Sequence, residues 1–174
     1  MRKLSILSYI FAGLMLSSCD GYLKEDPRDQ LYPEDAYDTP QNGYLNTVAS
    51  LYNYIGGYSD SQGLQGTYRG VYDLNTFTND EAMLPTRGGD WYDGGFWQGL
   101  FLHKWGTNSD AIQATWEYLY KVIVLSNQSL EILGELRQKT DYNDLDRYEA
   151  EVRAFRAMYY YYLVDMFGRV PLIV

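Results

Sequence analysis

The strongest constraint on the fold of this chain is the stretch of residues 143–167, which is followed by Gly168 and, three positions later, by Pro171. Apolar side chains recur in it at steps of three and four residues, the spacing of one face of an α-helix. They are Leu145, Tyr148, Val152, Phe155, Tyr159, Tyr162, Leu163 and Met166. Gly168 suits the left-handed residue that ends a helix, and Pro171 prevents the helix from restarting. Four consecutive tyrosines at 159–162 put rings all round this helix, so we expect other elements to pack on both sides of it.

A second long helix is predicted for residues 110–136. Asp110 and Gln113 have the form of a capping box at its start. Its apolar stripe comprises Ile112, Trp116, Leu119, Ile123, Leu130 and Leu133. Because only a short turn separates the two long helices, they should form an antiparallel hairpin. Shorter helices are predicted for residues 44–55, 68–77 and 96–105, and the first is a candidate extra layer on the hairpin. We expect Tyr72 of the second, and Trp97 and Trp105 of the third, to face inward, and His103 to be a surface or hydrogen-bonded residue.

Three polar or terminal features of the hairpin lead to separate expectations. Glu149 and Arg153 lie four residues apart and should pair on the wet face. Asn127 interrupts the stripe of the second helix and needs hydrogen-bond partners if it is buried. The apolar run at residues 170–174 is predicted to stop without a partner.

Composition excludes several classes of function. The net charge is −9, from 14 basic and 23 acidic residues, and nucleic-acid binding depends on basic side chains that neutralise phosphates. One His and one Cys leave no disulfide within the chain and no metal site of the His and Cys type. We therefore expect no nucleic-acid partner, no metal ligand set and no cofactor.

The N-terminus has the pattern of an export signal. A basic Arg2-Lys3 pair precedes an apolar stretch at 4–16, which is too short for a bilayer, since a spanning helix needs roughly 20 apolar residues. Leu-Ser-Ser-Cys at 16–19 resembles the lipobox of bacterial lipoproteins, which implies cleavage after residue 18 and acylation of Cys19. Residues 19–43 are interpreted as a lipidated tether and an extended arm. Lys24-Glu25-Asp26 in it resembles the acidic surface-export signal of Bacteroidetes lipoproteins, and an ordinary polar tether is an equal alternative.

Residues 78–95 are predicted to be irregular because they contain Pro85 and four glycines, yet they carry two large rings, Trp91 and Tyr92. One interpretation is an aromatic platform for a sugar ring, with Arg87, Asp90 and Asp93 binding the sugar hydroxyls. The other is a small satellite core with Trp91 buried beneath the loop. Because neighbouring residues in an extended loop face opposite ways, we expect one ring to face the ligand and the other to anchor the loop, with Trp91 outward.

Two segments resemble the SusD/RagB family. They are residues 153–172, with the run of tyrosines and the Gly-Arg-Val-Pro stop, and Pro-Thr-Arg-Gly-Gly-Asp-Trp-Tyr-Asp at 85–93. Members are outer-membrane lipoproteins of Bacteroidetes that capture nutrients, usually glycans, for a TonB-dependent, SusC-like transporter. The resemblance implies an all-α fold of tetratricopeptide-like helical hairpins with long irregular loops, in which residues 44–174 form the N-terminal part of a truncated SusD-like domain. It also implies a lipid-anchored, surface-exposed place at the outer membrane and a ligand site drawn from Arg87, Asp90, Trp91, Tyr92 and Trp97.

Two other functions compete with glycan binding. One is a helical scaffold that docks protein partners without a sugar ligand. The other, a glycoside hydrolase, is disfavoured because it needs two carboxylates facing each other across the sugar, and the adjacent Asp80 and Glu81 would point apart. A Ser-His-Asp set would require the single His, so we expect no catalytic residues and no enzyme. The sequence names no particular glycan and does not separate a glycan from a peptide ligand.

The lipobox generates the first prediction. Cys19→Ala removes the sulfur that would carry an acyl chain, so the variant should move from the membrane fraction to the soluble fraction, since lipid chains supply the anchoring free energy. Fractionation with a high-salt wash, followed by immunoblotting, measures this. A Cys19→Ala protein that stays in the washed membranes would place the anchor elsewhere.

Overall fold

The computed structural model describes residues 35–56, 63–64 and 70–174. The chain divides into two units, Met1–Asp35 and Ala36–Val174, and the second carries the structure presented below. The predicted signal peptide, Cys19 and the predicted tether up to residue 34 lie outside the described residues, as does most of the loop expected at 58–66. Among the described residues no helix is both long and apolar enough to cross a membrane.

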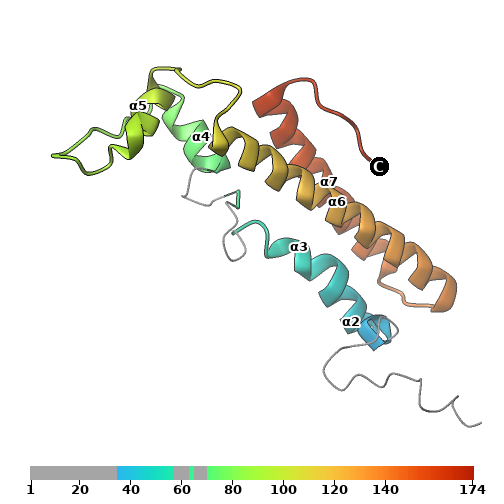
Figure 1. The fold of residues 1–174 in the computed structure, drawn as a ribbon. Coiled ribbons are helices and arrows are strands. Elements are labelled where there is room, and N and C mark those ends of the chain that lie inside the picture. The colour runs from blue at the N-terminus through green and yellow to red at the C-terminus, as the bar shows by residue number, and fades with distance from the viewer. Residues whose placement is uncertain (1–34, 57–62, 65–69) are drawn as a thin grey trace, which may run out of the picture. The chain divides into compact units, whose positions relative to one another are not determined.

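The described chain is helical, which confirms the all-α prediction. In order, its elements are the 3-10 turn η1 (Asp35–Tyr37), α2 (Pro40–Tyr44), the π-helical turn η2 (Leu45–Ala49), α3 (Ser50–Tyr52), α4 (Val71–Phe77), the 3-10 turn η3 (Asp93–Gly95), α5 (Phe96–Phe101), α6 (Asp110–Lys139) and α7 (Leu145–Phe167). Helices α6 and α7 lie side by side as the predicted antiparallel hairpin, and the run from α2 to α3 packs along it (Figure 1).

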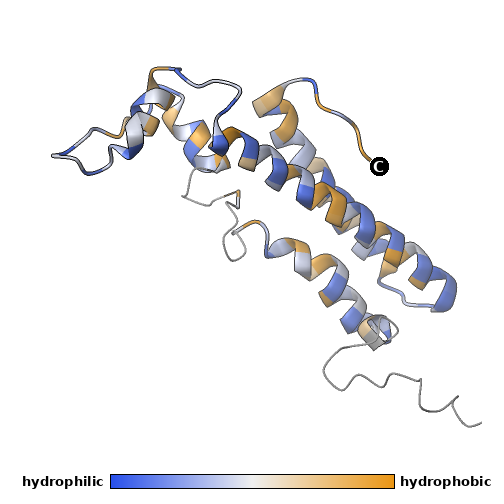
Figure 2. Cartoon of the chain, in the orientation of Figure 1, coloured by the Kyte–Doolittle hydropathy of each residue, from blue (hydrophilic) through white to orange (hydrophobic). Residues whose placement is uncertain are grey.

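The main core lies between these helices and follows the predicted stripes. On α7, all six residues at the helical spacing from Leu145 to Leu163 are buried: Leu145, Tyr148, Val152, Phe155, Tyr159 and Leu163. They meet Leu119, Ile123 and Leu133 of α6, and Val48 and Leu51 complete the cluster from η2 and α3. Apolar and polar residues alternate along both long helices, as amphipathic helices require (Figure 2).

One side of α7 remains open in the described part of the chain. Tyr161 is 65% exposed and Val164 is 54% exposed, although we expected packing on both sides. The α6 helix and the α2–α3 run cover the stripe that contains Tyr159, and a helix of 3.6 residues per turn then turns Tyr161 away from them.

A buried hydroxyl pair joins the two long helices. Tyr118 of α6 donates a hydrogen bond to the backbone carbonyl of Tyr54, and its Oη lies 2.9 Å from the Oη of Tyr159 on α7. The two rings meet edge to face at 5.8 Å. Since a buried hydroxyl without a partner costs about 1–3 kcal/mol, this pairing lets two tyrosines enter the core at low cost and fixes the register of the helices.

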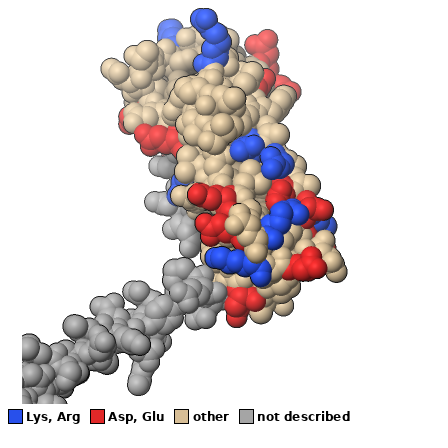
Figure 3. Space-filling model, turned by 90° about the vertical axis from the view of Figure 1, so that its right-hand side faces the viewer, with Lys and Arg blue, Asp and Glu red and all other residues tan. Residues whose placement is uncertain are grey.

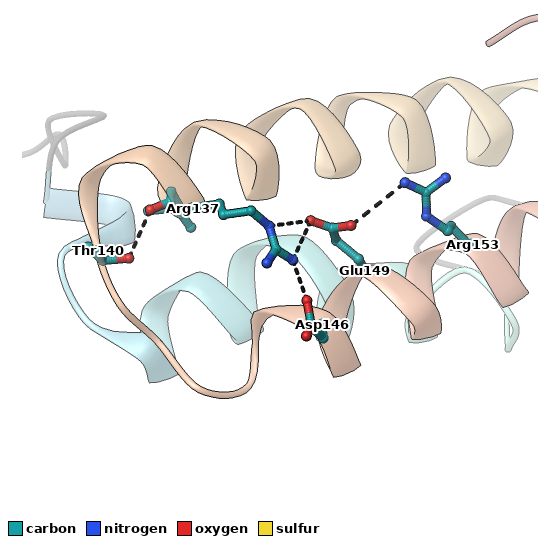
Figure 4. Close-up of polar contacts among 6 residues, drawn as sticks. Arg137, Thr140, Asp146, Glu149 and Arg153 are labelled. Atoms are coloured by element: carbon teal, nitrogen blue, oxygen red, sulfur yellow. Dashed lines mark hydrogen bonds and ion pairs between the residues drawn. The ribbon is translucent and has the colours of Figure 1, made fainter.

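Ion pairs outside the core tie the end of α6 to the start of α7 (Figure 4). Nη2 of Arg137 lies 2.7 Å from Asp146 and 2.9 Å from Glu149, and Glu149 also lies 3.7 Å from Arg153, which confirms the predicted pair. Figure 3 shows such basic and acidic side chains interleaved on one face of the molecule. Because all of these side chains except Glu149 are exposed, the ion pairs add little to stability, and the core determines the hairpin.

The tail after α7 runs back beside the hairpin instead of ending without a partner (Figure 1). Tyr120 donates to the Pro171 carbonyl at 2.7 Å, and the Tyr160 hydroxyl lies 2.7 Å from the amide nitrogen of Ile173 and 2.9 Å from its carbonyl oxygen. Asn127 finds the partners that its position required: it donates to the Ile173 carbonyl at 3.2 Å and accepts from Arg156 at 2.8 Å. Side chains of α6 and α7 thus bind the tail backbone at Pro171 and Ile173, while the side chains of Leu172 and Val174 remain exposed.

Several predicted boundaries were wrong. The first helix begins at Pro40, not at 44, because Thr39 accepts a hydrogen bond from the Asn42 amide and Pro40 fits the first helical position. The helix expected at 68–77 begins at Val71, and Tyr72, expected inward, is 52% exposed. The helix expected at 96–105 ends at Phe101, because His103 adopts a positive φ of 54°.

Phe155 tests the predicted face of α7. Its ring is 6% exposed and meets Tyr52 edge to face at 4.5 Å. We expect Phe155→Ala to lower the free energy of unfolding by about 3–5 kcal/mol, since it leaves a cavity in the core. Denaturant unfolding followed by circular dichroism measures this, with Tyr161→Ala as the exposed control on the same helix; a loss below about 1 kcal/mol would mean that this face is not the core.

The buried tyrosines also predict a pH dependence. Burial raises the pKa of Tyr159 from 10.0 to about 12, so the folded state holds the neutral phenol more strongly than the unfolded chain does. This stabilisation is complete below about pH 10 and is lost as the pH rises toward 12. Tyr159→Phe should therefore flatten the fall of melting temperature across that window, whereas Tyr161→Phe should not. Equal slopes in the parent and Tyr159→Phe proteins would contradict the assignment.

Candidate functional site

The loop between α4 and α5 contains a tight two-residue turn at Gly88 and Gly89. The backbones of Arg87 and Asp90 pair in both directions, at 3.2 and 2.9 Å, around Gly88 and Gly89. Both glycines have positive φ, 58° and 106°, which side chains rarely adopt and which this kind of hairpin turn requires. Residues directly opposite each other in such a pair point to the same face, so the turn places the Arg87 and Asp90 side chains together.

Trp91 and Tyr92 follow this turn, and both rings are more than half exposed. Trp91 is 59% exposed and Tyr92 is 55% exposed. The structure therefore does not bury Trp91 beneath the loop, and the expectation that one of the two rings anchors the loop was wrong. Trp91 also has a φ of 58°, a left-handed conformation that costs of the order of 1–3 kcal/mol for a bulky residue and that persists only where the surroundings impose it.

Trp97 is the ring that anchors the loop. It is 5% exposed and packs with Leu74, Leu100 and Ala111 in a second core cluster, with Phe77 and Phe96 edge-on to it. Its indole Nε1 donates to Oδ2 of Asp93 at 2.7 Å. From the sequence we expected Trp97 both to face inward and to bind the ligand. The structure places it inward, where it has no open ring face for a ligand.

Two further hydrogen bonds fix the base of the loop. Gln98 of α5 donates to the Thr86 hydroxyl at 2.5 Å, just before the tight turn. Nε2 of His103 lies 2.7 Å from the Thr78 carbonyl at the start of the loop, in agreement with the expectation of a hydrogen-bonded surface His. Together with the bond between Trp97 and Asp93, these contacts hold a short exposed tip, residues 87–92, on a fixed base.

The tip combines exposed rings with exposed polar groups. Within the described part of the chain, the side chains of Arg87 and Asp90 form no ion pair or hydrogen bond. Arg87 thus offers a rigid fork of donors, and Asp90 offers acceptor oxygens. No group of three His, Cys, Asp or Glu side chains that could hold a metal ion occurs among the residues that the structure describes.

The fold and this loop define an all-helical protein that presents an anchored aromatic tip. Residues 66–174 match the SusD-like family described as "Starch-binding associating with outer membrane". The chain is also 25% identical over 175 residues to the "SusD-like protein P25" of Formosa agariphila; the match covers 98% of this chain and 31% of that relative. No solved structure matches the chain.

The chain therefore belongs to the SusD-like family, as its sequence motifs indicated. The family is associated with the outer membrane and with starch binding, and its members are binding proteins rather than enzymes. The aligned part spans under a third of the relative's length, so the site of a whole relative can include residues that have no counterpart here.

Sequence reasoning missed the role of Asp93. We expected it to bind sugar hydroxyls, whereas the structure gives one of its oxygens to Trp97. No helical spacing indicates this contact, because Asp93, Gly94 and Gly95 all have positive φ and α5 begins only at Phe96.

Proposed function

We propose that this protein is a lipid-anchored protein of the outer-membrane surface that binds a glycan and passes it to a TonB-dependent transporter. The observation that carries the proposal is the pair of exposed rings, Trp91 and Tyr92, beside an anchored turn, with the backbone of Trp91 in a strained conformation. Large aromatic side chains without a packing role are costly to expose, so their exposure favours a binding role. Membership of a family associated with starch binding supports a carbohydrate ligand.

The chemistry of the tip suits a sugar. One face of a pyranose ring carries C–H groups and packs well on an aromatic plane, which Trp91 and Tyr92 both offer. The hydroxyls point outward from the ring edge and need donors and acceptors, which Arg87 and Asp90 supply from the same face of the turn. Gly88 and Gly89 let a ligand approach the backbone without a side chain in the way. A glycan thus finds its apolar and polar surfaces both matched within six residues, 87–92.

The membrane side of the proposal rests on the sequence. An acylated Cys19 would hold the protein at the outer membrane through its own chains, and the family association with that membrane supports this. From a position at the membrane surface, the protein passes the bound glycan to a transporter in the same membrane. A scaffold that docks proteins without a sugar ligand is the alternative, and the binding experiment below separates the two.

The loop predicts a separation between binding and stability. Trp91→Ala and Tyr92→Ala should each weaken binding of maltoheptaose by roughly 2- to 10-fold, the range given by about 0.5–1.5 kcal/mol for an aromatic contact. Neither should lower the melting temperature, because both rings are exposed. Trp97→Ala should instead lower the melting temperature strongly, since it empties the second core cluster.

Isothermal titration calorimetry and thermal melts of the purified protein measure both effects. Tyr161→Ala is the matched control, because that ring is 65% exposed on α7 and lies outside the loop. If both loop variants bind maltoheptaose as tightly as the parent protein does, the tip does not contact the glycan. If the parent protein does not bind maltoheptaose at all, the scaffold alternative is favoured.

A further inference from the structure

A hollow away from the tip lies where the ends of α4, α5 and α7 meet the start of α6. It has a volume of about 340 Å³. Sites for small molecules in proteins range from about 300 to 1,000 Å³, so this hollow suits one compact ligand. Its lining, in the part of the chain that the structure describes, includes none of the tip residues 87–92. We call it the Asp165 pocket.

Most of the Asp165 pocket is apolar, and its apolar lining is already packed. This lining consists of Leu74, Leu100, Ile112, Met166 and Phe167. Leu74 and Leu100 are buried members of the second core cluster, and Met166 packs against both core clusters. The Phe167 ring meets Trp116 edge to face at 5.0 Å. A ligand with an apolar body thus finds a preformed surface, which lowers the cost of binding.

Trp105 adds an aromatic side to the pocket. From the sequence we expected it to face inward, but α5 ends at Phe101 and the positive φ of His103 turns the chain, which leaves Trp105 44% exposed. The indole meets the His103 ring at 5.2 Å, and Nε2 of His103 lies 2.7 Å from the carbonyl oxygen of Thr78. Because Thr78 also lines the pocket, this chain of contacts holds the indole beside it.

The polar lining consists of Asn75, Thr78 and Asp165, and Asp165 alone among these described lining residues carries a charge. The Thr78 hydroxyl already donates to the Leu74 carbonyl at 2.6 Å. The Asp165 carboxylate has no hydrogen bond or ion pair with any described residue, although Arg169 follows it by four positions. The pocket thus combines an apolar surface with one uncompensated negative charge.

This combination selects the charge of a ligand. A carboxylate beside an apolar surface attracts a cation and repels an anion, and its interactions are stronger there than in open water. An indole also attracts a cation through the negative face of its ring. The net charge of −9 draws cations toward the whole protein in the same sense. A neutral apolar ligand would gain only the contacts with the apolar lining.

We propose that the Asp165 pocket binds a small organic cation, namely an ammonium group attached by a short arm to one apolar ring. The ring lies against Met166, Phe167 and Trp105, and the ammonium group pairs with the Asp165 carboxylate. This site is separate from the tip, and its ligand is not a carbohydrate, so the proposal stands independently of glycan binding.

Three probes of nearly equal shape test the charge of the ligand. They are 2-phenylethylamine, a cation at neutral pH, the neutral 2-phenylethanol and the anion 3-phenylpropionate. The amine should bind the parent protein roughly fivefold more tightly than the alcohol, an effect at the upper end of the range for exposed ion pairs. The anion should bind more weakly than the alcohol. NMR titration of the ¹⁵N-labelled protein measures the three affinities, and the amide signals of residues 165–167 should shift.

Two variants separate the charge from the apolar surface. Asp165→Asn keeps the shape of the side chain and removes its charge, so it should lower the affinity for the amine to that for the alcohol and leave the alcohol unaffected. Trp105→Ala should weaken binding of both by roughly 2- to 10-fold, the range for loss of an aromatic contact. Both side chains are exposed, so both variants should stay folded, which melting temperatures check.

Asp141→Asn is the matched control. Asp141 is an exposed carboxylate in the turn that joins α6 to α7, and it has no ion pair or hydrogen bond with the described residues. The substitution changes the net charge by the same amount as Asp165→Asn but lies at the other end of α7. It should keep the preference of the parent protein for the amine.

Each outcome decides for or against the pocket. Equal affinities of the parent protein for the amine and the alcohol, or a preference that survives in Asp165→Asn, would overturn the proposal. Loss of the preference in Asp141→Asn would also overturn it, because the effect would then come from net charge. Shifts confined to residues outside the pocket, or no binding of any probe, would equally count against it. None of these results bears on maltoheptaose binding at the tip.

Discussion

The rest of the structure depends on the packing of α6 against α7. The stripe from Leu145 to Leu163 closes on Leu119, Ile123 and Leu133, and the hydroxyls of Tyr118 and Tyr159 meet inside it. Tyr118 also holds the Tyr54 carbonyl, so the α2–α3 run is positioned by the same contact. Outer side chains of the hairpin then bind the tail. A change of one residue in the register of either helix would disrupt all of these contacts together, because each uses a specific turn of the helix.

The second core cluster fixes the position of the loop, as the packing of α6 against α7 fixes the position of the α2–α3 run and the tail. Trp97 joins Leu74 of α4 to Ala111 at the start of α6, so the base of the loop is fixed to the hairpin. Its bond to Asp93 and the bond from Gln98 to Thr86 hold the two ends of the exposed tip at residues 87–92 in place. Binding residues on a rigid base lose little conformational entropy when a ligand arrives, which favours affinity.

The sequence predicted the parts of this fold that obey a local period. The stripes of α6 and α7, the hairpin between them and the irregular loop all follow from spacing and from glycine and proline positions. The failures arose where the outcome depended on a backbone conformation or a packing contact that no helical period encodes. Trp105 has the spacing of an inward residue, yet the left-handed turn at His103 moves it outward. Trp91 and Tyr92 are exposed together because Trp97, five residues after Tyr92, already fills the core position beneath the loop.

The exposure of the rings and the strain of the backbone point to the same role. A protein under selection for stability alone would favour glycine at the left-handed position of Trp91 and polar residues at the tip, since both changes relieve a cost. The chain instead has glycine at 88, 89, 94 and 95, where φ is positive, and an indole at another left-handed position, where glycine would be easiest. The cost is local to the tip, while the core beneath it is regular and well packed. That distribution is expected when a surface is shaped by a ligand and the helices serve to hold it in place.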